Sequence, residues 1–378
     1  MNLTTELNLP LKLVFGKGVF NLLGREAAIF GKKAFLVTGG SSAKKSGALD
    51  KALNFLKNEN IESIVFDKVL PNPTTAIVYE GTEALKKEKC DFVIGLGGGS
   101  ILDCAKAIAF AVKNDGDIMD YVYGRKPAGE ALPVVLIPTT CGTGSEGNGF
   151  AVLTDIKTND KKSLRCNSIV PKVSIVDPDL MKTMPKKILA SVGFDALCHC
   201  IEAYISAIGT TKTSLISLIG IKLISESLII LYDGKGSDKD WENLSRASTI
   251  GGMVIGIAGV TAAHGLEHPA SGLRNIVHGE GLCALTPIIC KKSIAVAPQK
   301  FAEIAKNLGA KDETELVEKI EMLIDRLNLP KNLSSQGIKR EDVEWMSENA
   351  LKVSAAGLKN HPAQFGIDEI KEIYYSAL

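Results

Sequence analysis

The sequence has almost no net charge, and this excludes several classes of partner. It contains 44 Lys and Arg against 43 Asp and Glu, which gives a formal net charge of +1. Proteins that bind nucleic acid or anionic membranes through their surface charge carry an excess of basic residues. We therefore expect neither a nucleic-acid partner nor a membrane partner.

The sequence also lacks the signals of export, of a membrane span and of a disulfide framework. The first fifteen residues contain no basic stretch followed by an apolar core. The most apolar run, Leu215 to Tyr232, is interrupted by Lys222 and Glu226, which predicts a mostly buried helix. The eight cysteines are scattered without a C-x-x-C pair, as is typical of free thiols in a reducing cytoplasm. We expect a cytoplasmic protein.

Length and local patterns predict two domains of different class. The 378 residues exceed one ordinary hydrophobic core. Strand-like segments alternate with helix-like ones in the first half. The strand-like segments span residues 32–39, 61–69, 91–100 and 132–140, and the helix-like segments span residues 46–60, 74–90 and 101–114. This alternation predicts a parallel sheet with helices on both faces. Only helical patterns follow after about Met184, so we predict an α/β domain over residues 1–184 and an all-helical domain over residues 185–378.

A glycine-rich turn follows the third strand-like segment. Gly97, Gly98 and Gly99 come directly after buried residues, and Ser100 is expected to cap the next helix, with Asp103 at its third position. Bare backbone N–H groups beside a helix N-terminus form an anion site suited to a pyrophosphate. The alternative is a tight strand–helix turn without a ligand. Neither a P-loop nor a complete G-x-G-x-x-G fingerprint is present.

Two further loops follow strand-like segments and bear on the cofactor. In the first, Gly39 and Gly40 stand where an acidic side chain would hold a ribose 2′-hydroxyl. Hydroxyl and amino groups come after these glycines: Ser41, Ser42, Lys44 and Lys45. This pattern favours NADP(H) over NAD(H), while a solvated loop is the alternative. The second loop, residues 138–155, combines threonines with glycines and allows close approach to a ribose or nicotinamide. Cys141 lies in it without a neighbouring histidine, and we interpret it as a packing residue.

The segment GFDALCHCIEAY and a downstream group of histidines predict a metal site. Asp195 and His199 are four apart and share one helix face. Successive helical residues turn by about 100°, so Cys198 and Cys200 point to either side of His199 and are expected to pack in the core. Glu202 is better placed for a hydrogen bond to a ligand than for ligation.

Histidines further along the chain supply the other expected ligands. Catalytic metal sites usually take three or more protein ligands, and His264 and His278 are the natural additions. Small uncharged residues precede His264, which predicts a buried helix ending at the site. His268 is four residues after His264 and should lie near the ion.

Four motifs together resemble one enzyme family. The segments GGGSILDCAK, PTTCGTGSE, GFDALCHCIEAY and HGLEHPASGLRNIVHG stand in the order and at the separations found in iron-dependent (group III) alcohol dehydrogenases. The resemblance covers essentially the whole chain and is nearest to the butanol dehydrogenase-like members.

The resemblance implies a dinucleotide-binding N-terminal domain, a helical metal-binding C-terminal domain and a homodimer. It implies the metal ligands Asp195, His199, His264 and His278, and a place for His268 in the proton path. It implies cofactor contacts from Gly39, Gly40, Ser41, Ser42, Gly97, Gly98, Gly99, Ser100, Asp103, Thr139, Thr140, Thr143 and Lys161. The implied metal is Fe(II), although the same ligands suit zinc, nickel or cobalt. Phe150 would face the substrate. Arg274 is either a surface residue or a residue that binds a substrate carboxylate.

The implied reaction is the reversible oxidation of a primary alcohol to an aldehyde. Polyol or glycerol-type dehydrogenases and dehydroquinate synthase-like lyases share the architecture and stay open as alternatives, as does a cofactor-binding module without catalysis. The lyase would need a basic cluster for a phosphorylated acid, and no such cluster accompanies these motifs.

Overall fold

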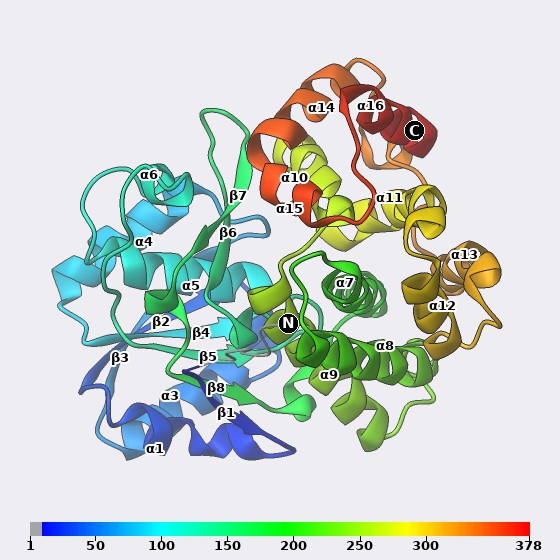
Figure 1. Ribbon diagram of the computed structural model, residues 1–378. Coiled ribbons are helices and arrows are strands. Elements are labelled where there is room, and N and C mark those ends of the chain that lie inside the picture. Colours follow the sequence, from blue (N-terminus) through cyan, green and yellow to red (C-terminus); the bar gives the residue numbers. More distant parts are fainter. Residues whose placement is uncertain (1–9) are drawn as a thin grey trace.

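The computed structural model describes residues 10–378 and combines a sheet region with a helical region (Figure 1). Residues 1–9, which hold most of the segment tested for an export signal, lie outside the described part. A six-stranded sheet with the order β1-β8-β5-β4-β2-β3 is parallel throughout. Its strands are β1 (Lys12–Phe15), β2 (Lys33–Gly39), β3 (Glu62–Val69), β4 (Phe92–Gly97), β5 (Val134–Pro138) and β8 (Val173–Val176). The predicted α/β fold with a parallel sheet is confirmed.

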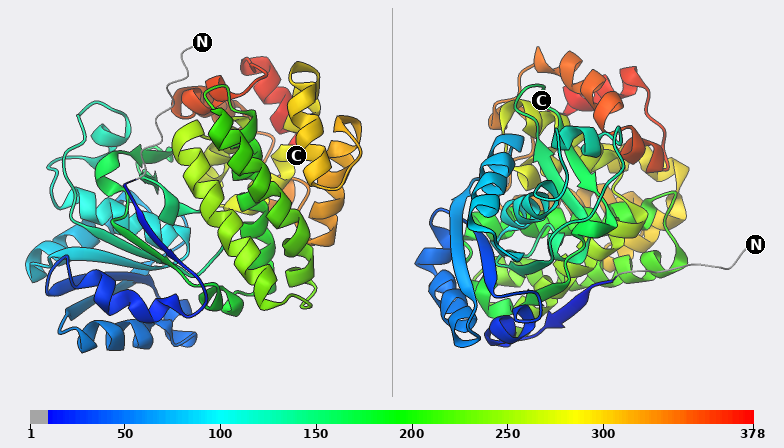
Figure 2. Two further views of the ribbon diagram at one scale, coloured as in Figure 1. Left: turned by 60° about the horizontal axis from the view of Figure 1, so that its bottom comes forward. Right: turned by 90° about the vertical axis from the view of Figure 1, so that its left-hand side faces the viewer.

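Helices cover the sheet because its central strands are apolar on both faces. Strands β4 and β5 are buried along their whole length, as expected for parallel strands between two helical layers. The helices of this region are α1 (Leu23–Ala27), α2 (Ser42–Lys45), α3 (Ala48–Asn58), α4 (Thr75–Glu88), α5 (Gly99–Ala111) and α6 (Ile118–Val122). The view down the sheet shows helices on both sides of it (Figure 2).

The helical region follows the last strand, and the prediction of an all-helical second half is confirmed. Its longer helices are α7 (Lys186–Ile205), α8 (Thr211–Tyr232), α9 (Asp238–Ala258), α10 (Ala262–Arg274) and α11 (His278–Ser293). The remaining helices are α12 (Pro298–Asn307), α13 (Leu316–Arg326), α14 (Asp342–Val353), α15 (Ala355–Asn360) and α16 (Ile367–Ala377). Helices α7, α8 and α9 pack side by side (Figure 2).

Helix α8 is less buried than its sequence predicts. Helices α7 and α8 both have the length and hydropathy of a membrane span, but 83% of the apolar window of α7 is buried within the protein, against 39% for α8. Leu215 and Ile219 on α8 are 61% and 52% exposed. The prediction of a mostly buried helix was wrong, because α7 and α9 cover only one side of α8.

An antiparallel hairpin, which the sequence analysis did not identify, connects the two regions. Strands β6 (Phe150–Thr154) and β7 (Lys161–Arg165) pair outside the main sheet and stand beside α14 (Figure 1). Asp160, at the turn of the hairpin, accepts hydrogen bonds from Asn349 Nδ2 at 2.7 Å and Lys352 Nζ at 3.0 Å on α14. It also accepts a hydrogen bond from the Tyr123 hydroxyl. These contacts hold the hairpin against the helical region.

Candidate functional site

Helix α7 carries an aspartate and a histidine one turn apart. Asp195 and His199 are 2% and 5% exposed. Their side chains lie on the same face, with Asp195 Oδ1 3.6 Å from His199 Nε2, as the spacing of four residues predicts.

A sharp bend brings a second histidine to this pair. Helix α9 ends at Ala258, and the axis of α10 turns away from it by 101°. Gly259 at the bend has φ of +68°, a left-handed backbone conformation that favours glycine. His264 lies in the first turn of α10, with its Nε2 3.3 Å from Asp195 Oδ1. The prediction of one helix ending at His264 was wrong, because the bend starts a new helix before it.

His278 completes the cluster as the first residue of α11. Its Nε2 lies 3.7 Å from Asp195 Oδ1. Three histidine Nε2 atoms from three helices therefore surround one carboxylate oxygen. All four residues that the family resemblance implied as metal ligands are brought together.

The other ring nitrogen of each of these histidines faces an acceptor. His264 Nδ1 donates to Glu202 Oε1 at 2.6 Å, and His278 Nδ1 donates to Glu267 Oε2. His199 Nδ1 lies 3.3 Å from the carbonyl oxygen of Gly142. Because carboxylates and carbonyls only accept, each Nδ1 carries a proton, and Nε2 is the ring nitrogen that can bind a metal when the ring is neutral. This is the arrangement in which histidine binds a metal.

The inward-facing atoms lack any other partner in the described residues. Asp195 Oδ1 and His264 Nε2 are both buried without a hydrogen bond, which is unusual for polar atoms. Burial opposes ionisation of Asp195, but His199, His264 and His278 outweigh it and hold the pKa of the carboxyl below its usual range. Burial also lowers the pKa of His264, yet Glu202 and Asp195 raise it to about 10. The cluster therefore favours a cation at its centre, and its oxygen and nitrogen donors fit a divalent metal.

Glu202 both orients His264 and caps the helix that carries it. Its Oε2 accepts hydrogen bonds from the backbone N–H and the hydroxyl of Thr261, the latter at 2.9 Å. Its Oε1 accepts from the backbone N–H of His264 at 3.2 Å as well as from the ring. A carboxylate on α7 thus satisfies free N–H groups at the N-terminus of α10. The expected hydrogen bond from Glu202 to a ligand is confirmed, and His264 is its partner.

Glu267 orients His278 as Glu202 orients His264, by accepting a hydrogen bond from the ring Nδ1. The sequence had not been read as pointing to this residue. It is fully buried on α10. It stands three residues after His264, so helical spacing places it toward the same cluster. That spacing was an available signal.

His268 lies beside the cluster without joining its centre. Its ring centroid is 6.1 Å from that of His264 and 5.7 Å from that of His278. Burial, followed by the nearby charges of Lys161 and the other histidines, lowers the pKa of His268 well below its usual value. The imidazole is neutral at pH 7.

The glycine turn lies at the carboxyl end of β4, where a parallel sheet binds its ligands. Gly98 precedes α5 and Gly99 begins it, so the prediction that Ser100 caps this helix was wrong. Ser100 Oγ instead accepts from the backbone N–H of Asn72 at 3.3 Å, and Asp103 lies beyond the third helical position. A side chain at Gly99 would come within 2.3 Å of Thr143, so the close packing of the two loops requires glycine.

The loops after β4 and β5 meet at this edge of the sheet. Thr139 donates its backbone N–H to Gly97 O at 2.9 Å. A side-chain carbon at Gly98 would lie 3.3 Å from Thr140. Gly39 is the last residue of β2, the strand next to β4, and Gly40, Ser41 and Ser42 follow it. Lys44 in that segment pairs with Asp67 at 2.7 Å.

Asp103 and the buried Lys106 form hydrogen bonds that hold the segment after β5 in place. The Asp103 carboxylate accepts from Ser145 Oγ at 2.5 Å and from the Val152 backbone at 3.0 Å. Lys106 has no exposed surface and donates to Ser145 O at 2.8 Å. Burial lowers its pKa to about 8, against the opposing charge of Asp103.

One cavity connects the histidine cluster to the glycine turn. Ten of the residues singled out in the sequence line it: Gly99, Ser100, Asp103, Thr143, Lys161, Asp195, His199, His264, His268 and His278. Phe150 lines it as well. The other eight lie outside its wall, at the carboxyl ends of β2, β4 and β5: Gly39, Gly40, Ser41, Ser42, Gly97, Gly98, Thr139 and Thr140.

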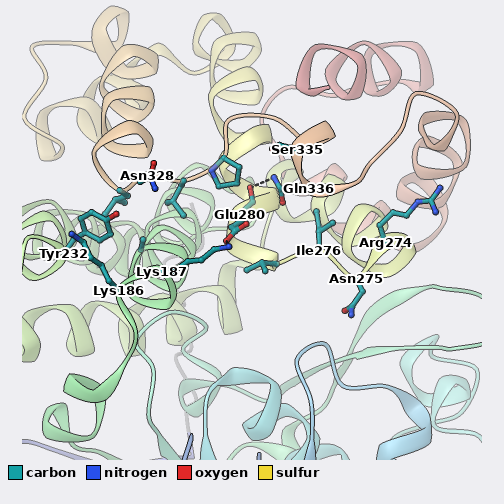
Figure 3. Close-up of a pocket in the computed structure, with 15 residues that line it drawn as sticks. Lys186, Lys187, Tyr232, Arg274, Asn275, Ile276, Glu280, Asn328, Ser335 and Gln336 are labelled. Carbon is teal, nitrogen blue, oxygen red and sulfur yellow. Dashed lines mark hydrogen bonds and ion pairs between the residues drawn. The ribbon is translucent and has the colours of Figure 1, made fainter. Parts of the chain in front are cut away.

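A larger cavity of about 800 Å³ lies elsewhere, between the starts of α7 and α11 (Figure 3). Two of its three cations are already paired with carboxylates, and the third, Lys186, lies 4.0 Å from the centre of the Tyr232 ring. Lys187 contacts Glu280 at 3.1 Å, and Arg274 makes two hydrogen bonds to Asp342, at 3.0 and 2.5 Å. Arg274 is thus held by a carboxylate of the chain itself. The smaller cavity contains the unpartnered Asp195 Oδ1 and His264 Nε2, and we therefore take it as the candidate site.

The cysteines take no part in the cluster. All eight are free thiols, as predicted. Cys198 Sγ contacts Thr286 and Cys200 Sγ points at the carbonyl of Ala247, so both turn away from Asp195. Cys141 is fully buried and packs in the core.

Comparison with known proteins places this site in a family. The model described as "Iron-containing alcohol dehydrogenase" matches residues 10–178, and "Fe-containing alcohol dehydrogenase family, C-terminal" matches residues 189–378. The chain is 35% identical over 373 residues to 1,3-propanediol dehydrogenase of Citrobacter freundii, covering 96% of both. It is 33% identical over 379 residues to NADPH-dependent butanol dehydrogenase of Clostridium saccharobutylicum, covering 97% of this chain and 96% of the relative.

A solved structure agrees with this placement over the whole chain. An archaeal halo-thermophilic alcohol dehydrogenase from a Red Sea brine pool superposes with a TM-score of 0.95 at 31% identity, covering 100% of both chains. Together with the two matched models, this shows that the chain is an oxidoreductase belonging to the iron-containing alcohol dehydrogenase family.

Proposed function

We propose that the protein interconverts a primary alcohol and its aldehyde by hydride exchange with NADP(H), with a divalent metal at the histidine cluster. The observation that carries the proposal is the convergence of three histidine Nε2 atoms on the unpartnered Asp195 Oδ1. The cavity that contains these atoms also reaches Gly99 at the glycine turn, so one space serves metal, substrate and cofactor.

Four residues would hold the metal: Asp195, His199, His264 and His278. When bound, the metal would act as a Lewis acid on the substrate oxygen, and the nicotinamide would carry the hydride. One carboxylate and three imidazoles suit Fe(II), and also zinc, nickel or cobalt. The Nδ1 contacts of Glu202 and Glu267 keep the rings turned inward.

The chain's own residues would align the reactants and move the proton. His268 is neutral beside the cluster and would pass the alcohol proton between the cavity and solvent. Lys161 would contact the cofactor ribose from the hairpin. It is held there by Asn72 Oδ1 at 3.0 Å and Ser271 Oγ at 2.7 Å. Cofactor contacts are proposed for Gly39, Gly40, Ser41, Ser42, Gly97, Gly98, Gly99, Ser100, Asp103, Thr139, Thr140 and Thr143.

The preference for NADP(H) rests on the loop after β2. Gly39 and Gly40 offer no carboxylate to repel a 2′-phosphate, and Lys44, which pairs with Asp67 at 2.7 Å, lies on the helix that follows. One relative is named for NADPH, while another is an NAD-dependent methanol dehydrogenase of Bacillus methanolicus. The relatives therefore do not decide between the cofactors. In this proposal residues 1–184 bind the cofactor, residues 185–378 bind the metal, and the enzyme is a cytoplasmic homodimer.

A substrate and cofactor panel tests the proposal. Metal-reconstituted protein is assayed for NADPH and NADH consumption with linear aldehydes, and with glycerol-type polyols in reverse. We expect NADPH-dependent reduction of butanal that disappears on chelation. Preference for NADH would remove the cofactor assignment, and the absence of turnover with every aldehyde and alcohol would remove the reaction itself.

A further inference from the structure

Arg165 is a cation of the active cavity that the chain itself does not neutralise. Within residues 10–378 its guanidinium has no hydrogen bond and no ion pair with a carboxylate. The other cation in the cavity wall, Lys161, is held by two neutral partners and lies 3.9 Å from Glu267. Arg165 therefore differs from Lys161 in facing the cavity with an uncompensated charge.

The hairpin fixes where Arg165 points. In the antiparallel register Arg165 is opposite Phe150, while Lys161 is opposite Thr154 at the other end of the hairpin. The guanidinium lies 4.5 Å from the centre of the Phe150 ring, a stacked arrangement that holds the head in place. Both side chains line the cavity that contains Asp195 and the histidines.

The surroundings of Arg165 make its charge matter to a ligand. Arg165 is exposed at the cavity. Nearby protein atoms nevertheless remove some water from its guanidinium and lower the pKa of that group. Because the side chain is exposed at the cavity and has no counter-ion, it is available to an anion that enters.

We propose that the preferred substrates carry a carboxylate at the end remote from the reacting carbon, and that Arg165 binds it. This inference rests on the proposed function. The aldehyde carbon of an ω-oxo acid receives a hydride from NADPH, and its oxygen gains one proton. The products are the ω-hydroxy acid and NADP⁺, and the carboxylate is unchanged throughout. A planar guanidinium binds a carboxylate through two parallel hydrogen bonds, and Phe150 covers the chain between.

A cofactor phosphate is the other anion that could meet Arg165, and the fold argues against it. In the proposed function the backbone N–H groups at Gly98 and Gly99, at the N-terminus of α5, would hold the cofactor pyrophosphate. Lys44 lies on α2, which follows β2. Arg165 is at the end of the hairpin away from Lys161, on the side of Phe150.

Steady-state kinetics with matched substrates tests the assignment. Metal-loaded wild type, Arg165→Gln and Arg165→Lys are assayed with 4-oxobutanoate and with butanal, which has the same chain length but no charge. The control is Arg125→Gln. Arg125 also stacks on an aromatic ring, 4.8 Å from the centre of Tyr123, but its side chain is 64% exposed and outside the cavity.

We expect Arg165→Gln to raise the KM for 4-oxobutanoate by about 10- to 100-fold. The KM for butanal, the KM for NADPH and the kcat for butanal should stay within about threefold of wild type. Arg165→Lys should restore part of the affinity, and Arg125→Gln should match wild type. Equal losses for both substrates would mean a structural role and overturn the inference. A raised KM for NADPH with every substrate would assign Arg165 to the cofactor instead.

A binding measurement separates this inference from the proposed function. Calorimetric titration compares 4-hydroxybutanoate with butan-1-ol on the wild type and on Arg165→Gln. Arg165-dependent binding of the hydroxy acid without turnover would refute the proposed reaction and support the carboxylate site. Turnover of butanal with no preference for the oxo acid would support the reaction and refute the site.

Discussion

Replacing Glu202 by glutamine tests whether this carboxylate both orients the metal-binding His264 and stabilises the fold. Glu202 is 2% exposed and accepts four hydrogen bonds, two on each oxygen, from Thr261 and His264. Two of the four donors are backbone N–H groups, one on each carboxylate oxygen, and these cannot act as acceptors. Glutamine has the same shape but only one accepting oxygen. In either amide orientation its NH₂ group faces at least one of these N–H groups.

The magnitude follows from what is lost on each side. Loss of a carboxylate that orients a metal-binding histidine typically lowers metal affinity about 10- to 100-fold, which equals about 1.4–2.8 kcal/mol. The metal-free protein should also lose about 1.5–3 kcal/mol of stability. A charge-assisted hydrogen bond is broken inside the protein, and the N-terminus of α10 loses its negative cap.

Two measurements on Glu202→Gln check these numbers. Metal affinity is obtained by competition with a calibrated chelator, and the free energy of unfolding is obtained by urea titration of the metal-free form. Metal stabilises the folded state by mass action, so the two forms must be compared separately. The control is Glu226→Gln, an exposed glutamate on α8 whose contact to Lys222 is 3.9 Å.

The reasoning would be refuted by a variant that keeps both properties. Metal affinity within about threefold of wild type, with a stability change below about 0.5 kcal/mol, would mean that Glu202 neither orients His264 nor caps α10. Loss of stability with unchanged metal affinity would remove only the orienting role.

Three further changes have defined outcomes. His278→Ala should contain no bound metal when measured by elemental analysis, and its turnover should fall at least about 100-fold. Its far-UV spectrum should be unchanged, because the His278 side chain is 24% exposed. A metal-free variant with full activity would contradict the ligand set. Gly99→Ala should weaken cofactor binding at least about tenfold in a fluorescence titration, since the new methyl would lie 2.3 Å from Thr143; unchanged binding would show that the loops are free to separate. Asp160→Asn should flatten the acid limb of the stability curve. Burial opposes ionisation of Asp160, but the hydrogen bonds it accepts outweigh burial and hold its pKa below the ordinary 3.8. The contribution of Asp160 to the free energy of unfolding is therefore complete above pH 3.8 and is lost as pH falls toward the folded-state pKa of the carboxyl. Parallel acid limbs in the two proteins would disprove this.

Short-range patterns in the sequence sufficed for several parts of the site. Alternating strand-like and helix-like segments predicted the parallel sheet, and a glycine run after a buried strand predicted the turn at Gly97. The spacing of four residues predicted that Asp195 and His199 share a face. Helical geometry also predicted that Cys198 and Cys200 point away from that face. These inferences succeed because helix and strand periods are set by the local backbone.

Other parts were outside the reach of local patterns. The sequence predicted one helix ending at His264, whereas Gly259 bends the chain by 101° and a new helix presents the ring. The hairpin that carries Lys161 and Arg165 was not identified, because two short strands outside the main sheet have a weak periodic signal. Ser100 resembled a helix cap, but the glycine before it starts the helix.

The sequence by itself therefore determined which residue types are available and which short-range faces they share. Only the tertiary structure decided which of them meet. Asp195 and His278 are far apart in the chain, and their atoms lie 3.7 Å apart because α7, α10 and α11 pack around one point. The same packing pairs His278 with Glu267 and Arg274 with Asp342, and it leaves Arg165 without a counter-ion. Long-range contacts of this kind depend on the burial of apolar faces along the whole chain, which no local segment encodes.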